Sequence, residues 1–299
     1  MITVLGSINM DLIATTARLP APGETVAGSN FSTAAGGKGA NQALAATRAG
    51  ASVRMAGAVG DDTFAEPALA LLAEAGTDLS ATAHLPGPTG TALILVGGDG
   101  ENMIAVVPGA NGKVGASAAI AAVEAMQAGD ILMLQLEIPA PAIEAGLKLA
   151  RARGVISVIN TAPLTREAAQ LASLCDIVIA NETEFELLTG RERLSASERK
   201  EAVLALHRDR GQTIIVTLGG DGVIAARDGK LMSAVGLSIE PVDTVGAGDT
   251  FCGYLAAGLD AGLDFETALR RAAVAGSLAC MKAGAQPAIP TAAEVAARL

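Results

Sequence analysis

Short apolar runs alternate with helical patterns of apolar and polar residues in the second half of the chain. Continuous apolar runs are typical of strands that are buried on both faces of a sheet. Four such runs occur, at Ile131–Leu136, Val155–Ile159, Ile177–Ala180 and Thr213–Leu218. Helical patterns lie at Ala142–Arg153, Thr165–Leu174 and Ser197–Arg210. This alternation predicts an α/β fold whose mainly parallel sheet has helices on both sides.

The same pattern extends toward both ends of the sequence. Further strands are predicted at Ile2–Leu5 and Val53–Ala58, with a helix at Asn41–Ala49 between them. Two long Ala-rich helices are predicted at Ala247–Ala261 and Phe265–Lys282. A chain of 299 residues can use all of these elements in one large α/β unit.

Two segments interrupt this rhythm. Residues 12–35 contain prolines, glycines and short β-like pieces. Residues 89–107 are typical of a hairpin, because the apolar stretches TALILV and MIAVVP flank the turn GGDGEN. We expect the two segments to form a small β lid, inserted into a core of residues 1–11, 36–88 and 108–299.

The composition excludes several classes of protein. Apolar residues make up 51% of the chain and charged residues 17%, which excludes an intrinsically disordered protein. A net charge of −10, without a cluster of Lys and Arg, argues against nucleic acid or a membrane as a partner. The sequence shows neither a signal peptide nor an apolar run long enough to span a bilayer, so we expect a cytoplasmic protein.

The cysteines and histidines limit the chemistry further. Cys175, Cys252 and Cys280 include no CxxC pair and resemble small buried residues rather than nucleophiles or disulfide partners. We expect His207 to face solvent in a charged helix and His84 to lie in a loop. P-loop and Rossmann glycine motifs are both absent. Chemistry must therefore come from Asp, Glu, Lys, Asn and backbone groups.

The strongest local feature is DTVGAGDTF at residues 243–251, which opens a long predicted helix. Gly246, Ala247 and Gly248 are small, so an anion can approach the backbone N–H groups at the positive end of the helix dipole. Asp249 in the same turn can accept a proton from a hydroxyl held beside that anion. Alternatively, Asp249 only caps or charges the first turn.

Polar residues at two other places can bind hydroxyl groups. The stretch GGKGANQ at 36–42 offers Lys38 and Asn41 beside exposed backbone, although a flexible turn explains it equally well. Asn9 and Asp11 follow the first strand, where open α/β sheets place ligand groups, or they belong to a turn. Glu137 ends an apolar run, which is more often a solvated strand end than a ligand.

Two further segments have an ordinary structural explanation. Asn181 and Glu184 have the spacing of a helix capping box, which we favour from the spacing alone. TLGGDG at 217–222 lies between two apolar runs and is typical of a tight hairpin turn.

Taken together and in this order, these segments resemble the ribokinase, or PfkB, family of carbohydrate kinases. The resemblance extends from SINMD near the start to GAQPAIP near the end. Its specific anchors are GGKGANQA at 36–43 and DTVGAGDTF at 243–251, supported by QLE, NETE, TLGGDG and GENMIAVVPGAN. The resemblance implies a ribokinase-like three-layer α/β/α fold, with a β lid that often pairs with the lid of another subunit in a homodimer.

The resemblance also implies roles for single residues. Asp249 would be the base that activates the sugar hydroxyl, and the N–H groups around Gly246, Ala247 and Gly248 would hold the transferring phosphoryl group. The sugar hydroxyls would be held by Asn9, Asp11, Gly37, Lys38, Asn41 and Glu137. Asn181 and Glu184 would organise Mg²⁺ and the phosphates of ATP. The nucleotide would lie along Thr217, Leu218, Gly219, Gly220, Asp221 and Gly222, with Ala273 near the adenine.

Members of the family similar to ribokinase also bind a monovalent cation, commonly K⁺. Asp243 and the carbonyl groups of Val245, Ala279, Lys282 and Gly284 would surround it. Ala288 stands where these kinases often supply a serine hydroxyl, so one ligand is lost or replaced by water. We therefore expect K⁺ activation of uncertain strength.

By resemblance, the expected reaction is phosphorylation of D-ribose to D-ribose 5-phosphate with ATP. Fructose, another ketose, a sugar acid and a nucleoside are the alternative acceptors. The chain contains five Phe, one Tyr and no Trp, which counts mildly against a nucleoside base that stacks on aromatic rings. A non-catalytic sugar or nucleotide sensor is a different possibility, but it would have little reason to keep Lys38, Glu184 and Asp249 together.

Overall fold

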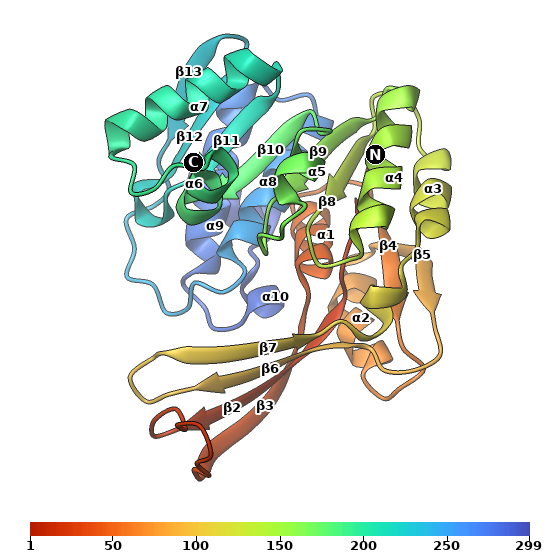
Figure 1. The fold of residues 1–299 in the computed structure, drawn as a ribbon, viewed down its shortest axis with the longest axis vertical. Helices are drawn as coiled ribbons and strands as arrows, with labels where there is room; N and C mark the ends of the chain where they lie inside the picture. The colour runs from red at the N-terminus through yellow and green to blue at the C-terminus, as the bar shows by residue number, and fades with distance from the viewer.

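A nine-stranded sheet forms the centre of the molecule in the computed structural model, which describes residues 1–299 (Figure 1). In spatial order its strands are β13 (Lys230–Ala234), β12 (Val223–Arg227), β11 (Thr213–Thr217), β10 (Ile177–Asn181), β9 (Ile156–Asn160), β8 (Ile131–Leu134), β1 (Ile2–Leu5), β4 (Val53–Val59) and β5 (Asp78–His84). All neighbours from β11 to β5 pair in parallel, whereas β12 and β13 are antiparallel additions. The predicted mainly parallel sheet is confirmed.

Helices cover both faces of this sheet. One face packs against α1 (Lys38–Arg48), α2 (Ala65–Ala75), α8 (Ala247–Asp260), α9 (Phe265–Ala279) and α11 (Ala292–Ala296). The other packs against α3 (Ala116–Glu124), α4 (Ala140–Arg153), α5 (Ala168–Ala172), α6 (Glu182–Thr189) and α7 (Ala196–Arg210). Successive side chains of a strand point to opposite faces, so Ile131 and Met133 join the first layer while Leu132 and Leu134 join the second. The result is three layers, helix, sheet and helix.

A second, four-stranded sheet projects from the edge of these layers (Figure 1). Its order is β3 (Gly28–Gly36), β2 (Asn9–Thr16), β6 (Gly90–Val96) and β7 (Asn102–Val107). The predicted hairpin is present as the antiparallel pair β6–β7. β2 already begins at Asn9, which is in register with Gly36 on one side and Gly90 on the other. The strands of the small sheet therefore reach into the residues that we expected to belong to the core.

Some expectations were wrong in detail. His207 is 9% exposed rather than solvent-facing, because Gly229 donates its N–H to Nε2 and Nδ1 lies 2.6 Å from the Gln212 carbonyl oxygen. Such contacts allow an imidazole to be buried without an unpaired polar atom. His84 ends strand β5 rather than lying in a loop. Helix α1 begins at Lys38 rather than Asn41.

The cysteines follow the prediction in part. Cys175 and Cys252 are buried, Cys280 is half-buried, and all three are free thiols. Burial raises the pKa of each thiol, which opposes a nucleophilic role. None of the helices combines the length and apolar character that crossing a bilayer requires.

Candidate active site

The first turn of α8 forms one wall of the candidate site. Gly246 precedes the helix with φ 78°, and a Cβ atom there would lie 3.0 Å from the Cα of Ala285, so the turn requires glycine. A Cβ atom on Gly248 would meet nothing within 4 Å, so this side of the turn is open. The N–H groups of Gly248 and Asp249 have no backbone acceptor. An open helix start with free N–H groups is suited to an anion.

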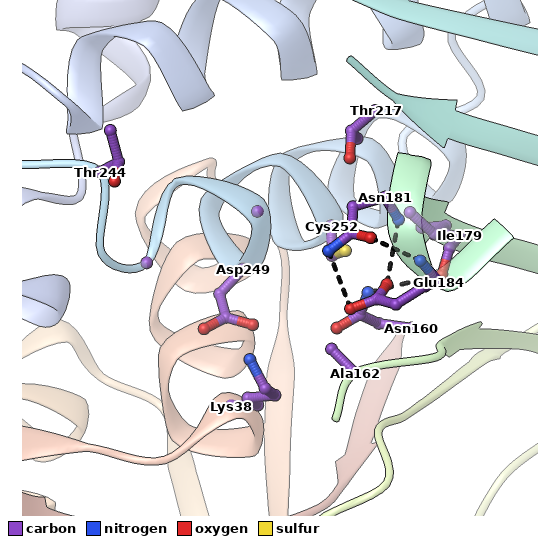
Figure 2. Close-up of a pocket in the computed structure, with 12 residues that line it drawn as sticks. Lys38, Asn160, Ala162, Ile179, Asn181, Glu184, Thr217, Thr244, Asp249 and Cys252 are labelled. Carbon is purple, nitrogen blue, oxygen red and sulfur yellow. Dashed lines mark hydrogen bonds between the residues drawn. The ribbon is translucent and has the colours of Figure 1, made fainter. Parts of the chain in front are cut away.

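Asp249 stands in this turn with only 6% of its surface exposed. Asn41 donates its amide to one carboxylate oxygen at 2.9 Å, and Gln42 donates to the other at 3.0 Å. Both amides come from α1, which packs directly against α8. Figure 2 shows the Lys38 ammonium beside the Asp249 carboxylate. The negative charge of Asp249 raises the pKa of Lys38 more than burial lowers it, so the ammonium is charged at neutral pH.

A second group of polar residues gathers where the small sheet meets the core. Glu137 accepts hydrogen bonds from the Ser7 hydroxyl and from the N–H of Lys38, the latter at 3.0 Å. Burial, followed by the charge of Glu137, raises the pKa of Asp11 to about 6. Asn9 accepts a hydrogen bond of 2.7 Å from the amide of Asn111. The three predicted residues Asn9, Asp11 and Glu137 are thus brought close to the start of α1, which follows directly on Gly37.

Asn181 and Glu184 lie at the start of α6, and the predicted capping box is confirmed. The Glu184 N–H donates to the Asn181 side chain at 2.8 Å, and the Asn181 N–H donates to the Glu184 carboxylate at 3.0 Å. The Thr161 hydroxyl also donates to that carboxylate, at 3.3 Å. The carboxylate is 9% exposed and still lines the candidate site, so capping does not remove it from the cavity.

Lys38 and the starts of α6 and α8 line a cavity of about 210 Å³ (Figure 2), whereas Asn9, Asp11 and Glu137 lie outside its lining. Its predicted lining residues are Lys38, Asn181, Glu184, Thr217, Gly246, Gly248 and Asp249. The sequence interpretation missed five others, namely Asn160, Ala162, Ile179, Thr244 and Cys252. Asn160 was detectable, because it directly follows the predicted strand Val155–Ile159, at the same sheet edge as Asn181. Cys252 was detectable as the residue almost one helical turn after Asp249.

Other predicted residues lie outside the cavity lining. Leu218 and Gly222 flank a short 3₁₀ turn, η2 (Gly219–Asp221), that joins the antiparallel strands β11 and β12, so the predicted hairpin turn is confirmed. Ala273 is 8% exposed and packs in the core between α9 and the sheet. The structure does not bring Ala273 to the cavity wall.

The loops around Asp243 are held together by its carboxylate. One oxygen accepts the N–H of Val245 at 3.0 Å, and the other accepts the N–H of Gly284 at 2.8 Å. Ala279 ends α9 and Lys282 follows it, while Ala288 ends the short helix α10 (Ala285–Ala288) and is buried. The predicted cation ligands therefore come from two adjoining loops, although no cluster of three His, Cys, Asp or Glu side chains occurs there.

Comparisons with known proteins agree with this fold. The family described as "pfkB family carbohydrate kinase" matches residues 1–292. A ribokinase of Haemophilus influenzae is 36% identical over 294 residues, covering 97% of this chain and 95% of the relative. A crystal structure of a Thermotoga maritima ribokinase matches with a TM-score of 0.89 at 28% identity, covering 99% of this chain and 98% of that one.

A structure of Arabidopsis thaliana ribokinase complexed with ribose and ATP matches with a TM-score of 0.88 at 30% identity. The match covers 99% of this chain and 97% of that one. The expected ribokinase-like fold, with a large mainly parallel sheet and a small separate sheet, is confirmed. The chain belongs to the pfkB family of carbohydrate kinases.

Proposed function

We propose that the protein transfers the γ-phosphoryl group of ATP to the 5-hydroxyl of D-ribose. The observation that carries the proposal is Asp249, a buried carboxylate in an open helix start, with the Lys38 ammonium beside it. The named activity of the ribokinase relatives and the ribose and ATP in the Arabidopsis structure support this acceptor and donor. The products are D-ribose 5-phosphate and ADP.

In the proposed mechanism Asp249 takes the proton from the ribose 5-hydroxyl while the oxygen of that hydroxyl attacks the γ-phosphorus. The new P–O bond forms as the bond to the ADP oxygen breaks, so charge develops on the transferring group and on ADP. We assign the N–H groups of Gly246 and Gly248, at the positive end of α8, to this charge, whereas the Ala247 N–H already donates to the Thr244 carbonyl at 3.3 Å. The main work of the protein is positioning and charge stabilisation.

The sugar would be held by the polar residues between the two sheets. Carboxylates accept hydrogen bonds from hydroxyl groups, whereas the ammonium and the amides donate to them. We assign this role to Asn9, Asp11, Gly37, Lys38, Asn41 and Glu137. The hydrogen bond from the Lys38 N–H to Glu137 supports the assignment, because it joins the start of α1 to the sheet junction.

The nucleotide would occupy the side of the cavity formed by α6 and the end of β11. Glu184 fits a water-mediated Mg²⁺ site, since its carboxylate lies in the cavity wall, and Asn181 would hold that carboxylate in place by donating its amide to it at 3.0 Å. Mg²⁺ would neutralise charge on the phosphates when bound. We place ATP along residues 217–222, and the buried methyl group of Ala273 is consistent with few contacts to the adenine.

A monovalent cation is proposed beside the helix start. Asp243 joins Val245 to Gly284, so the carbonyl-bearing loops that would surround the ion are already adjacent. The methyl group of Ala288 cannot ligate, so we expect weaker K⁺ activation than with a hydroxyl there. A comparison of initial rates in K⁺ and in Na⁺ tests this.

We also propose that the small sheet acts as a lid and forms a homodimer with a second copy of the chain. Several of its apolar side chains are exposed, namely Phe31, Leu93, Met103, Ile104, Val106 and Val107. Exposed apolar groups gathered on one small sheet favour burial against a partner. A cytoplasmic location is proposed as well, because three unpaired thiols fit a reducing compartment.

The test of the main proposal is an ADP-release assay with MgATP. Ribose, deoxyribose, fructose, 2-keto-3-deoxygluconate, adenosine and pseudouridine are offered separately, each in K⁺ and in Na⁺. We expect ribose to give the highest kcat/KM. A clear preference for another acceptor would reassign the sugar pocket. Absence of turnover, with ribose still raising the melting temperature, would contradict catalysis and indicate a sensor.

A further inference from the structure

A row of buried amides leads away from Asp249 into the core. Gln42 donates to the Asp249 carboxylate at 3.0 Å, and Gln135 donates to the Gln42 side-chain oxygen at 2.7 Å. The two glutamines are 1% and 0% exposed. They come from different elements, since Gln42 lies in α1 and Gln135 follows strand β8. Neither lines the cavity.

The direction of this row is fixed by Asp249. An ionised carboxylate only accepts hydrogen bonds, so Gln42 must turn its NH₂ group toward it. The Gln42 oxygen then faces Gln135, which must also present its NH₂ group. Reversal of either amide would place two oxygen atoms against each other.

The row ends at an atom without a partner. The side-chain oxygen of Gln135 is buried and makes no hydrogen bond. It lies so close to the backbone that a Cβ atom on Gly6 would be only 2.0 Å away. A buried acceptor without a partner is destabilising. Reversal of the Gln135 amide would instead place its oxygen against the Gln42 oxygen, so the orientation of the whole row is set by its hydrogen bond to Asp249.

We propose that Gln42, held in place by Gln135, is a positioning residue for Asp249. The inference rests on the proposed role of Asp249 as the base. Together with Asn41, Gln42 places one donor on each carboxylate oxygen. Each oxygen keeps a lone pair for a substrate hydroxyl. The amide row thus fixes the plane of the carboxylate, so that its free lone pairs point where a substrate hydroxyl can donate.

The test compares Gln42→Leu, Gln42→Glu and Gln135→Met with the unchanged protein. Loss of a hydrogen bond to a charged group predicts that Gln42→Leu lowers kcat about 10- to 100-fold, with less than about a threefold change in the KM for ribose. Gln42→Glu keeps the size of the side chain but adds a negative charge beside Asp249. Because a second negative charge disfavours ionisation of Asp249, the acid limb of the kcat/KM profile should move to higher pH. Lys38, the nearby cation, is unchanged in this variant. Gln135→Met should lower kcat less than Gln42→Leu does.

Gln212→Met provides the structural control. Gln212 is a buried glutamine that donates only to main-chain carbonyls far from the site, at Ala172 and Cys175. Its replacement should lower the melting temperature and leave kcat and the pH profile unchanged. Should Gln42→Leu fail to fold, Gln42→Glu and Gln135→Met decide the question.

Asp249→Asn separates this inference from the proposed function. If Asp249→Asn is inactive while both Gln42 variants keep the kcat and pH profile of the unchanged protein, the positioning role is overturned and the base is retained. If Asp249→Asn is fully active, both the base and the positioning role fall. A fall in kcat with a shifted acid limb, absent from Gln212→Met, supports the proposal.

Discussion

At the scale of single residues, Asp249 is the group on which the proposed chemistry depends. Replacement of Asp249 by Asn keeps the size of the side chain and the first turn of α8 but removes the proton acceptor. We expect Asp249→Asn to lower kcat by about 100-fold or more while ribose still binds. Steady-state rates and calorimetric titration with ribose check this. Asp209→Asn, an exposed change on α7, serves as the control, and near-normal turnover of Asp249→Asn would remove it as the base.

The Asp11 carboxylate is expected to help sugar binding but to lower the stability of the fold at neutral pH. Its pKa is about 6 in the folded protein against 3.8 for an ordinary Asp, so the folded state binds the proton more tightly. This stabilisation is complete below pH 4 and is lost as the pH rises through 6. At pH 7.5 the ionised, partly buried carboxylate therefore lowers the free energy of unfolding.

We expect Asp11→Asn to raise the free energy of unfolding at pH 7.5 by about 1–3 kcal/mol and to change it little at pH 4. The same change removes a carboxylate acceptor and should raise the KM for ribose. Denaturant unfolding at both pH values measures the first effect. An equal effect at both pH values would contradict the assignment of the shift to Asp11.

Single site residues were predicted correctly where they stand in a recognisable motif. The prediction failed where contacts between distant elements determine whether a side chain is buried. Asp249, Lys38 and Glu184 stand in segments whose small residues and charges signal a site, and the structure brings them to one cavity. Gln42 stands in the same GGKGANQ segment, but nothing in the sequence shows that its side-chain amide contacts Asp249. His207 was misplaced because its partners, Gln212 and Gly229, belong to a contact between elements.

At the scale of elements, two glycines at the start of α8 differ in what a side chain would meet. Gly246 has a left-handed backbone and a close neighbour, whereas Gly248 faces open space. Gly246→Ala would put a methyl group in a left-handed conformation and 3.0 Å from the Cα of Ala285. We expect it to lower the free energy of unfolding by about 1–2 kcal/mol and to reduce kcat. Gly248→Ala meets no atom, so it should keep or raise stability while its methyl group impairs use of ATP.

Thermal unfolding and ATP kinetics of the two variants distinguish these effects. Equal losses of stability in Gly246→Ala and Gly248→Ala would mean that both glycines serve the helix alone. Loss of ATP use in Gly248→Ala without loss of stability supports the anion site.

Elements with strong periodicity were predictable and the weakly patterned ones were not. The parallel strands of the second half are continuous apolar runs, and the β6–β7 hairpin has apolar stretches on both sides of a polar turn, so both followed from the sequence. β5 (Asp78–His84) was missed because it is a partly exposed edge strand of mostly small or polar residues. The bounds of α1 were displaced because Gly37 and Gly39 obscure the first turn.

At the scale of the whole molecule, the exposed apolar side chains of the small sheet predict association. We expect the protein to be a dimer by light scattering and Ile104→Asp, in β7, to be a monomer. Ile104 is 56% exposed, so a charge there should not unfold the chain alone. Leu187→Asp, at a residue 59% exposed on α6, is the control that should stay dimeric. A monomeric unchanged protein, or a dimeric Ile104→Asp variant, would exclude this interface.

The contact between α1 and α8 also sets the time at which a newly made chain can become active. Asn41 and Asp249 are separated by 208 positions, so the ribosome must add most of the protein before they can meet. At about 5–20 residues per second, this interval is on the order of 10–40 s. A chain interrupted before α8 already contains the proposed sugar-binding residues from both sheets. It lacks α8, whose side chains belong to the core on one face of the sheet, and it lacks the group that takes the proton of the sugar, so synthesis itself delays catalysis until the chain is nearly finished.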